Sequence, residues 1–443
     1  MLKQLYLKGI TAYSQGKTQQ AAQHLTSYVA QMGSHVEALK ILGICHFDLG
    51  NYPKAIQAFE KTLALQATDD ETWFNLGLCH VKTDNLHQAI RCYTACVQRN
   101  PQHSKAHIGL ADIHKALNQT NEAITHYMAA IQLRGLNASD LLFKLSQVLL
   151  LKGAWEEGFE LFEHRIALDT ASREHASLPR WQGQDVRGKR ILVECEQGFG
   201  DSIQFSRYLP LLLDAGAQVL LACPEPLQTL FQNAFPQIQV LLPGAQIEHA
   251  SVNYYTPLMS LAGLFKTTPD HVPLHQSYLS APQVSREKWE WLGRIQGMKV
   301  GLVWSGNPAH KNDKNRSINF EQLMAALPAN VAYFSIQKDD TSRPHPHFTS
   351  LSNNIENFSD TAAICTQMDV VITVDTSVAH LSGALGVPTW VMLPLSPDWR
   401  WLLNRNDSVW YDSVELLRQS NRSDWSCVLE RVNKKLFQLL ESK

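Results

Sequence analysis

The sequence predicts an α-helical repeat solenoid followed by an α/β region. Two observations carry this prediction: small and bulky residues recur every 34 positions in the first part of the chain, and short apolar runs alternate with helical stretches in the second. The length of 443 residues corresponds to about two to four domains. We expect residues 1–170 to form the solenoid, residues 171–284 a first α/β domain, and residues 285–443 a second one.

The composition excludes several classes of protein. The 39 Lys and Arg residues nearly balance the 41 Asp and Glu residues, so the formal net charge is -2 and gives no general attraction to nucleic acid or anionic lipid. Eight cysteines without a CxxC pair are typical of a reducing compartment. Lys3 and Lys8 interrupt any signal-peptide core, and the most apolar stretch, residues 141–151, is too short to span a bilayer. We therefore expect a cytoplasmic protein with no nucleic-acid partner and no stable membrane insertion.

The repeat register is set by small residues. Two series of them have an interval of 34 residues: Gly9, Gly43, Gly77 and Ala111, and then Ala21, Ala55, Ala89 and Ala123. A bulky residue stands four positions beyond each member of the second series: Leu25, Phe59, Tyr93 and Tyr127. This pattern is typical of paired amphipathic helices that cross closely at the small residue.

The third unit resembles the tetratricopeptide repeat in a set of matching positions: Trp73, Leu76, Gly77, Ala89, Tyr93 and Pro101. A fifth, degenerate unit is expected over residues 139–165, where it caps the solenoid. Stacked repeats of this kind resemble superhelices whose groove holds an extended peptide, so we expect a partner protein there. A spacer or a dimerisation arm is the alternative.

Apolar runs bounded by turn residues predict strands in the second half of the chain. These runs are residues 190–195, 218–222, 238–242, 299–304, 331–336, 370–374 and 389–393. A linker around residues 278–285 separates two groups, and each group is expected to form a Rossmann-like domain, so that a cleft lies between the carboxyl ends of the strands. A predicted helix over residues 424–442 could return to the first of the two domains.

The first candidate site follows the first predicted strand. Gly198 and Gly200 precede Asp201, which begins a helical stretch and would point into the cleft. A carboxylate placed there can accept the proton of an attacking hydroxyl as a general base. Asp is also a preferred helix cap, and the local sequence does not decide between the two roles. Glu196 is a second candidate base, or a structural carboxylate at the strand end.

The second candidate site is a polar cluster between the strand over residues 370–374 and a helix. Thr376 and Ser377, next to Asp375, would offer hydroxyl and N–H groups at a helix N-terminus, which is an anion site that suits a diphosphate. His380 lies about one turn into the helix and could reach the same anion. The alternative for His380 is a packing role in which a backbone carbonyl satisfies the ring.

Two further segments carry candidate ligand contacts. The turn after the strand over residues 299–304 leads into a basic loop, with Ser305, Asn307, Lys311 and Arg316 expected near the mouth of the cleft. Positive charge there can stabilise a leaving phosphate, whereas a solvated loop is the alternative. Trp399 and Arg400 offer a ring and a cation for stacking on a nucleobase or sugar, or they are buried against the C-terminal helix.

Four segments together resemble the tetratricopeptide-containing GT-B glycosyltransferases of the heptosyltransferase (family 9) type. They are EQGFGDSIQFSRYLP, GLVWSGNPAHKNDKNRSI, VITVDTSVAHLSGALGVPTWVMLP and PDWRWLLNRNDS. The resemblance implies two Rossmann-like halves, with a nucleotide-sugar donor on the C-terminal half and an acceptor facing the N-terminal half. It also implies that Asp201 matches the catalytic base and that Asp375, Thr376, Ser377 and His380 match the donor-phosphate motif. Ser377 stands where the lipopolysaccharide enzymes commonly have Gly, which puts the donor in doubt.

The expected activity is sugar transfer to a hydroxyl, without a cofactor or a metal. Members with repeats resemble flagellin-modifying enzymes, so the resemblance implies that the repeats recruit the protein whose Ser or Thr is modified. The sequence contains no Asp-x-Asp triplet, which metal-dependent transferases typically use to hold the donor through a divalent ion. Two alternatives stay open: transfer to a saccharide with the repeats used for assembly, and a non-catalytic repeat scaffold.

Overall fold

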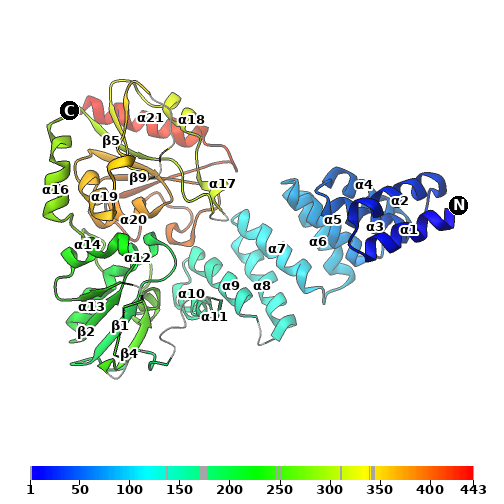
Figure 1. Ribbon diagram of the computed structural model, residues 1–443, viewed down its shortest axis with the longest axis horizontal. Coiled ribbons are helices and arrows are strands. Elements are labelled where there is room, and N and C mark those ends of the chain that lie inside the picture. Colours follow the sequence, from blue (N-terminus) through cyan, green and yellow to red (C-terminus); the bar gives the residue numbers. More distant parts are fainter. Residues whose placement is uncertain are drawn as a thin grey trace. The chain divides into compact units, whose positions relative to one another are not determined.

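The computed structural model describes residues 2–135, 138–168, 177–242, 244–245, 247–248, 251–309, 312–338, 340 and 345–442. The chain divides into two compact units, Met1–Leu145 and Ser146–Lys443 (Figure 1). None of the helices in the described ranges combines the length and the apolar content that crossing a membrane requires.

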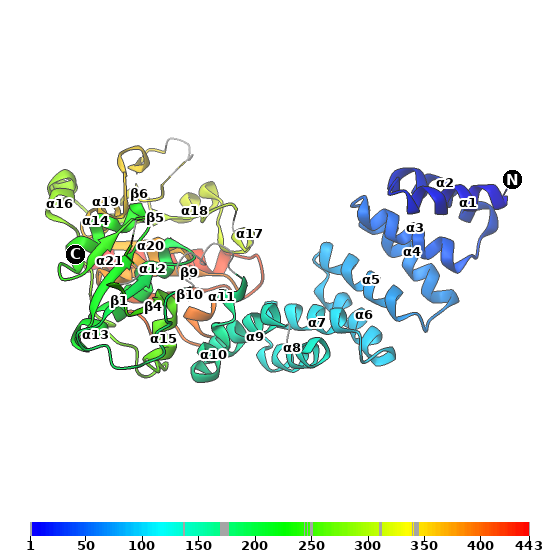
Figure 2. The same cartoon turned by 60° about the horizontal axis from the view of Figure 1, so that its bottom comes forward.

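Consecutive helices of the first unit pack in pairs (Figure 2). The helices are α1 Leu2–Ser14, α2 Thr18–Met32, α3 Val36–Asp48, α4 Tyr52–Leu65, α5 Asp70–Lys82, α6 Leu86–Arg99, α7 Ser104–Ala116 and α8 Thr120–Arg134, followed by α9 Ser139–Lys152, which crosses the boundary between the units. The predicted repeat of helix pairs is therefore confirmed.

Each glycine of the repeat register lies where its helix touches a bulky residue of the paired helix. A Cβ added at Gly43 would lie 2.5 Å from a ring atom of Phe59, and one added at Gly77 would lie 2.5 Å from a ring atom of Tyr93. Real Cβ atoms do not approach so closely, because close-packed interiors leave no room for overlap. The interval of 34 residues thus records a steric requirement of the helix pair.

The degenerate fifth unit repeats this packing and continues into the second compact unit. α10 (Trp155–Phe162) follows α9, and α11 (Arg165–Leu168) follows α10. A Cβ at Gly158 would lie 2.7 Å from Leu150, as in the regular repeats. On its other side α10 packs against α15 (Leu261–Leu264), where a Cβ at Gly263 would lie 3.1 Å from Phe159.

The second unit contains two parallel sheets. The first has the order β3-β2-β1-β4, with β1 Arg190–Glu194, β2 Gln218–Ala222, β3 Gln239–Leu241 and β4 Tyr254–Pro257. The second has the order β10-β9-β8-β5-β6-β7, with β5 Lys299–Val303, β6 Ala332–Ser335, β7 Phe348–Ser350, β8 Val370–Val374, β9 Thr389–Leu393 and β10 Val414–Arg418. Counted from its own first strand, the first sheet follows the doubly wound order 3-2-1-4, and the second follows the order 3-2-1-4-5-6.

Helices connect β1 to β2, β2 to β3, β5 to β6, β7 to β8 and β8 to β9, as is usual between parallel strands. The helices of the first sheet are α12 Phe199–Phe205, α13 Leu209–Asp214 and α14 Glu225–Ala234. Those of the second are α16 Gln283–Trp289, α17 Asp313–Arg316, α18 Phe320–Ala326, α19 Phe358–Cys365, α20 Ser377–Ala384 and α21 Ser426–Glu441. Seven strands lie where the sequence predicts them, whereas β4, β7 and β10 were not predicted.

The C-terminal helix belongs to the second sheet, so the expectation that it returns to the first domain is wrong. Val428, Val432 and Leu436 of α21 are buried in one cluster with residues of β5 and β8. Asn433 Nδ2 donates a hydrogen bond to the carbonyl of Ala326 at the end of α18 (2.5 Å). The apolar stripe of α21 predicts a buried face, but its spacing carries no information about which sheet covers it.

The two sheet regions are fastened together by α12, α20 and a buried arginine. A Cβ at Gly200 of α12 would lie 2.9 Å from the ring of His380 and 3.3 Å from the backbone of Ser377, so the two helices meet at these points. Arg207 is fully buried, and it donates to the carbonyl of Trp410 (2.8 Å) while its guanidinium lies over the ring of Tyr411. The first sheet region is thereby held against the second.

Candidate active site at the carboxyl ends of the two sheets

The predicted site residues follow strands at the points where strand order reverses. In doubly wound sheets ligands bind outside the carboxyl ends of the strands at such switch points, which here lie between β1 and β4 and between β5 and β8. Asp201 follows β1, Ser305 follows β5 and Asp375 follows β8. The fold therefore places the predicted residues where a ligand of such sheets is expected.

Asp201 has a partner for each carboxylate oxygen. Oδ2 accepts a hydrogen bond from the N–H of Gly198 (2.8 Å), which caps α12, and Oδ1 forms an ion pair with Arg400. The Asp201 side chain keeps 20% of its surface exposed. Because a carboxylate oxygen has two lone pairs, both oxygens can accept a further hydrogen bond. The cap is therefore present, and the carboxylate keeps both exposed surface and free lone pairs.

Arg400 is the centre of a buried polar network. It donates to Gln204 Oε1 (2.6 Å) and to Asp398 Oδ1 (2.8 Å) in addition to its contact with Asp201. Only 7% of the residue is exposed. A buried guanidinium whose donors are shared by several oxygens is fixed in position, so Arg400 orients the Asp201 carboxylate across the two sheets.

Trp399 lies in an aromatic cluster of the protein itself. The residue is 3% exposed, and its ring centroid is 5.7 Å from that of Phe159 and 5.8 Å from that of Phe162. The Arg400 guanidinium covers the ring at 4.5 Å. A ligand ring would have to displace these groups, so this placement does not favour the stacking role expected for Trp399 and Arg400. The pair is buried against the region after α9 rather than against the C-terminal helix.

Arg316 lies beside the start of α20. Its NH1 donates to the backbone carbonyl of Asp375 (2.8 Å), and its Nε donates to Asp313 Oδ1 (3.3 Å). A Cβ at Gly306 would overlap the Arg316 guanidinium, so a larger residue there would push this side chain away from its present position. The structure thus brings the predicted Arg316 and Asp375 together.

The Asp375 carboxyl is in an unusual electrostatic setting. Burial, followed by the neighbouring Asp398 carboxylate, raises the pKa of Asp375 to about 6. The indole of Trp401 and the guanidinium groups of Arg316 and Arg400 act in the opposite direction. Asp375 therefore takes up a proton close to neutral pH, which is a feature found more often at functional sites than elsewhere.

Thr376 is the N-cap residue of α20, but its hydroxyl does not cap the helix. Oγ1 lies 3.1 Å from Oγ1 of Thr373 on β8. Ser377 is the first residue of the helix and is partly exposed. The start of α20 therefore combines the positive end of a helix dipole with two hydroxyl side chains, as the anion-site prediction requires.

His380 is buried rather than open to an anion. It is 5% exposed, its Nδ1 lies 3.1 Å from the Tyr411 hydroxyl, and its ring stacks on Trp401. Burial, with Arg400 as the next cause, lowers the pKa of His380 to about 3. The imidazole is therefore neutral at pH 7, so the expected stabilisation of a phosphate by a His380 cation does not fit this setting. The Tyr411 hydroxyl takes the place of the carbonyl named in the packing alternative.

The loop after β5 holds the remaining donor-side candidates. Ser305 Oγ accepts from Gln337 Nε2 (2.7 Å), and the Ser305 N–H donates to Gln337 Oε1 (3.1 Å). Asn307 is exposed, and its Oδ1 accepts from the N–H of Ala309 (2.9 Å). Lys311 lies outside the described residues. Ser305 is thus positioned at the switch point, whereas Asn307 closes its own turn.

Glu196 lies in a different cluster from Asp201. Its carboxylate forms an ion pair with Arg165 (2.6 Å) and accepts from the N–H of Met259 (3.2 Å). The Glu196 side chain is 7% exposed and that of Arg165 is 2% exposed. Burial raises the pKa of Glu196, although Arg165 counteracts this. The placement supports the structural alternative for Glu196, because its oxygens are occupied by protein donors.

Sequence reasoning missed several residues that hold the site together. Asp398, Gln204, Gln337 and Tyr411 contact predicted residues, as described above. Asp398 directly precedes a short 3-10 helix, which is a cap pattern that the sequence could have shown. Gln337 and Tyr411 come from distant segments, and no local signal connects them with Ser305 or His380.

One group of possible metal ligands among the described residues lies in the first unit. Ligand atoms of Asp70, Cys96 and His103 all lie within 4.8 Å of one another. His103 Nδ1 accepts a hydrogen bond from the N–H of Ala106 (3.1 Å), so the neutral ring carries its proton on Nε2 and has no lone pair left for a metal. Burial raises the pKa of Cys96 to about 12, which keeps the thiol protonated. This group is poorly prepared to bind a metal.

Comparisons with known proteins identify the repeats. A family model described as tetratricopeptide repeat matches residues 6–70. A second model, described as anaphase-promoting complex, cyclosome, subunit 3, matches residues 50–130. Both matches lie within the first compact unit.

A curated relative extends the similarity beyond the repeats. Protein FlbA of Caulobacter vibrioides is 26% identical over 329 residues, which is 66% of this chain and 54% of the relative. The chain therefore spans about half the length of the curated relative that it matches.

Solved structures of MamA are among those that match. The "Crystal structure of MamA protein" is 19% identical, covers 40% of this chain and 94% of its own, and has a TM-score of 0.36. "MamA AMB-1 P212121" is 24% identical, covers 40% of this chain and 98% of its own, and also has a TM-score of 0.36. "MamA 41-end from Desulfovibrio magneticus RS-1" is 19% identical, covers 39% of this chain and 96% of its own, with the same TM-score of 0.36. With the helix pairs and the repeat-family match, the N-terminal part of the chain is a tetratricopeptide-repeat solenoid, and a parallel-sheet α/β region follows it.

Proposed function

We propose that the protein is a metal-independent GT-B glycosyltransferase that moves a sugar from a nucleotide-sugar donor to a hydroxyl. The observation that carries the proposal is the ion pair between Asp201 and Arg400, which joins the switch point of the first sheet to the second sheet region. A carboxylate of one doubly wound sheet thereby faces the ligand edge of another, which is the arrangement that a two-substrate transfer needs.

The donor diphosphate binds at the start of α20 in this proposal. Backbone N–H groups of the first helical turn, with the hydroxyls of Thr376 and Ser377, offer hydrogen bonds to phosphate oxygens. Arg316, held against the carbonyl of Asp375, supplies the nearby positive charge. His380, which is neutral at pH 7, acts through packing and through its contact with Tyr411 rather than as a cation.

Asp201 acts on the acceptor. As the acceptor oxygen forms its bond to the anomeric carbon and the bond from that carbon to the phosphate oxygen breaks, Asp201 accepts the hydroxyl proton. Negative charge develops on the departing nucleoside diphosphate, and the helix dipole of α20 and Arg316 offset it. Arg400 is a positioning residue, because it touches Asp201 rather than the reacting atoms.

The acceptor in this proposal is Ser or Thr of a protein such as flagellin, recruited by the repeat solenoid. Tetratricopeptide solenoids are interaction surfaces in general, which supports protein recruitment. Transfer to a saccharide, with the solenoid used for assembly, is the alternative that the same catalytic residues would serve.

Purified full-length protein tests the proposal with a panel of UDP-, GDP-, ADP- and CMP-sugars. A donor at 100 times its dissociation constant should stabilise the protein by about 2.7 kcal/mol, which is measurable as a shift of the unfolding midpoint. Cleavage of the donor can be measured as release of the nucleotide, and its rate should decrease when Asp201 is substituted. If no donor binds and none is turned over, the scaffold alternative becomes the better one.

A further inference from the structure

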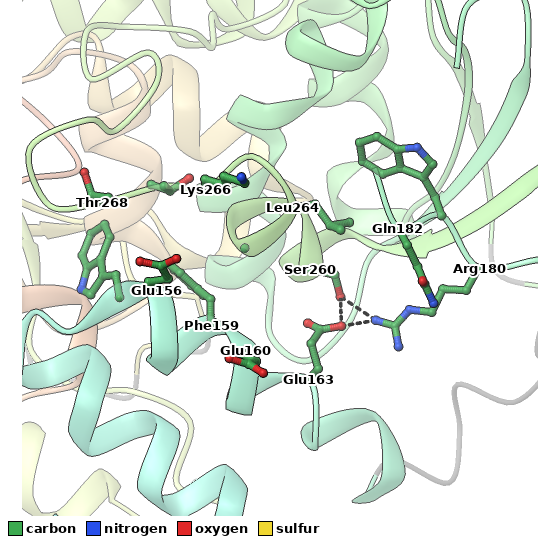
Figure 3. Close-up of a pocket in the computed structure, with 14 residues that line it drawn as sticks. Glu156, Phe159, Glu160, Glu163, Arg180, Gln182, Ser260, Leu264, Lys266 and Thr268 are labelled. Atoms are coloured by element: carbon green, nitrogen blue, oxygen red, sulfur yellow. Dashed lines mark hydrogen bonds and ion pairs between the residues drawn. The ribbon is translucent and has the colours of Figure 1, made fainter. Parts of the chain in front are cut away.

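A pocket of about 530 Å³ lies in the second unit beside α10 (Figure 3). Three segments line it: α10 with the adjoining Glu163, residues 180–182, and the segment 260–268, which contains α15. None of the residues assigned to the donor or to the catalytic base lines it. Its volume is in the range of sites that hold a small ligand or a few side chains.

The walls of the pocket present apolar surface. Trp155 and Trp181 are buried, and their indole N–H groups donate elsewhere, to the carbonyls of Leu150 (3.0 Å) and Gln184 (2.8 Å). The Thr267 hydroxyl is paired with Tyr208 (2.7 Å). Because these polar atoms already have partners, these three residues offer a ligand ring faces and aliphatic groups, while the exposed Gln182 contributes an amide at the edge. A sugar, which needs many hydrogen bonds, is poorly matched to such walls.

One end of the pocket is closed by a polar cluster that satisfies itself. Ser260 Oγ lies 3.0 Å from Glu163 Oε2 and 3.2 Å from an Arg180 nitrogen, and Arg180 also pairs with Glu163 (Figure 3). Glu163 also forms an ion pair with the buried Arg165 (2.7 Å between Oε1 and NH1). Since the Arg180 charge is matched by Glu163, this end has no unneutralised cation for a phosphate.

The rim of the pocket carries excess negative charge. Glu156 and Glu160 are exposed and stand four residues apart on α10, so they lie on the same side of the helix. Within the described part of the chain, neither forms an ion pair, and Lys266 is the lining residue of opposite sign besides Arg180. An apolar pocket with two acidic residues at its rim is complementary to an apolar side chain flanked by basic residues.

We propose that this pocket binds an apolar side chain of a polypeptide whose neighbouring residues are Lys or Arg. The identification of this polypeptide as the acceptor rests on the proposed function. Binding of the polypeptide in the pocket does not depend on that function. The back wall connects the pocket to the candidate base, because Phe159 packs on Trp399 (5.7 Å between centroids) and Trp399 carries the Arg400 guanidinium, the partner of Asp201.

Fluorescence anisotropy with short labelled peptides tests the inference on the full chain, without a donor. The probe is acetyl-Gly-Lys-Leu-Lys-Gly-amide, compared with a peptide that has Asp in place of Leu and with one that has Glu in place of both Lys residues. We expect the probe to bind and each substituted peptide to bind about tenfold more weakly or worse, because burial of Leu and rim attraction are lost. Equal binding of all three peptides, or displacement of the probe by inorganic phosphate, overturns the proposal.

Matched variants locate the binding. Glu160→Lys should weaken the probe about three- to tenfold, whereas Glu157→Lys, exposed on the same helix but outside the pocket, should leave it unchanged. Leu264→Trp fills the pocket and should abolish binding; if it does not fold, the charge reversals decide. Equal effects of the Glu160 and Glu157 substitutions would place the probe elsewhere. Probe binding without any donor turnover would instead overturn the glycosyltransferase proposal and leave the pocket standing.

Discussion

Asp201 serves as a helix cap and as the ion-pair partner of Arg400 at the same time. One oxygen accepts from Gly198, and the other faces the guanidinium. The local sequence leaves the cap and the catalytic base as alternatives, but the two roles are compatible because each oxygen has a second lone pair. At the scale of single residues, the second partner of Asp201 is thus Arg400, which lies 199 positions away in the sequence.

Asp201→Asn is expected to reduce the single-turnover rate about a hundredfold or more, because an amide cannot accept the hydroxyl proton. Donor affinity should stay within about twofold, since the amide oxygen still caps α12 and the proposed donor site is at α20. Rapid-quench kinetics beside calorimetry measures both quantities. Asp185→Asn, an exposed turn residue, is the control. A normal rate in Asp201→Asn would remove this residue from the mechanism.

His380 should make stability depend on pH. Its pKa is lowered to about 3 in the folded protein, below the ordinary value of 6.5, so the unfolded chain binds the extra proton between these values. Stability from the neutral ring is therefore complete above about pH 6.5 and falls as the pH decreases toward 3, by at most about 1.4 kcal/mol per pH unit.

His380→Gln removes this proton uptake, so its unfolding midpoint should fall less steeply between pH 6.5 and pH 4. Asp375, whose pKa is raised to about 6, acts in the opposite sense in both proteins and cancels in the comparison. Tryptophan fluorescence during thermal unfolding is the measurement, and the exposed His87→Gln is the control. Parallel pH profiles for wild type and His380→Gln would contradict a neutral buried imidazole.

At the scale of elements, periodicity predicts which segments form helices and strands, and packing decides the rest. β2, β8 and β9 have the bounds that their apolar runs predict. β4 and β7 were missed because their segments, YYTP and FTS, contain no Val, Ile or Leu and show no apolar run, whereas the equally short β3 and β6 lie within the longer apolar runs 238–242 and 331–336. The apolar stripe of α21 likewise predicts which face of the helix is buried, but it does not predict which sheet covers that face.

The contact between α12 and α20 gives a prediction at this scale. Gly200→Ala should destabilise the second unit by about 1–3 kcal/mol, because the new methyl would lie 3.3 Å from the backbone of Ser377 and 2.9 Å from His380. Displacement of the start of α20 should also weaken nucleoside diphosphate binding. Denaturant titration and calorimetry measure the two effects.

Gly198→Ala is the comparison, since the nearest atom to its methyl would be a side-chain atom, Asp201 Oδ2, at 3.1 Å, whereas the methyl at position 200 would meet a ring and a backbone. It should destabilise the unit less than Gly200→Ala does. If the Gly200 substitution is tolerated without loss of stability or of nucleotide affinity, the close approach of the two helices is not required for the site.

At the scale of the whole molecule, the solenoid and the α/β region can be separated experimentally. Deletion of residues 1–102 removes α1 to α6 and keeps the His103 ring that caps α7. Repeat solenoids owe their stability to neighbouring repeats, so the remaining helices should persist. Donor affinity should stay within about twofold, because the proposed donor residues all lie in the second unit.

Transfer by the truncated protein should fall about a hundredfold or more with an intact protein acceptor, because positioning by the repeats is lost. Transfer to a short acceptor peptide at high concentration should fall much less. The measurement is the transfer rate of both proteins with each acceptor, and circular dichroism checks that the truncated protein is folded. Undiminished transfer to the intact acceptor would favour the saccharide alternative.

The sequence by itself determined the helix pairs, the repeat family, most strands and the strand-end positions of the candidate residues. These features depend on contacts between residues close in the chain, or on steric rules that recur at a fixed interval. One such rule places Gly43 against Phe59, the bulky residue 16 positions later. Local physics is sufficient for them.

Only the tertiary structure decided what surrounds the candidate residues. It buries Trp399 among aromatic rings, keeps His380 neutral, ties Glu196 to Arg165 and brings Arg400 to Asp201. Burial and electrostatic partners of a side chain come from segments that are remote in sequence, and they set its charge and its accessibility. A motif therefore places a residue at the site, while the packing of distant segments decides its chemical state.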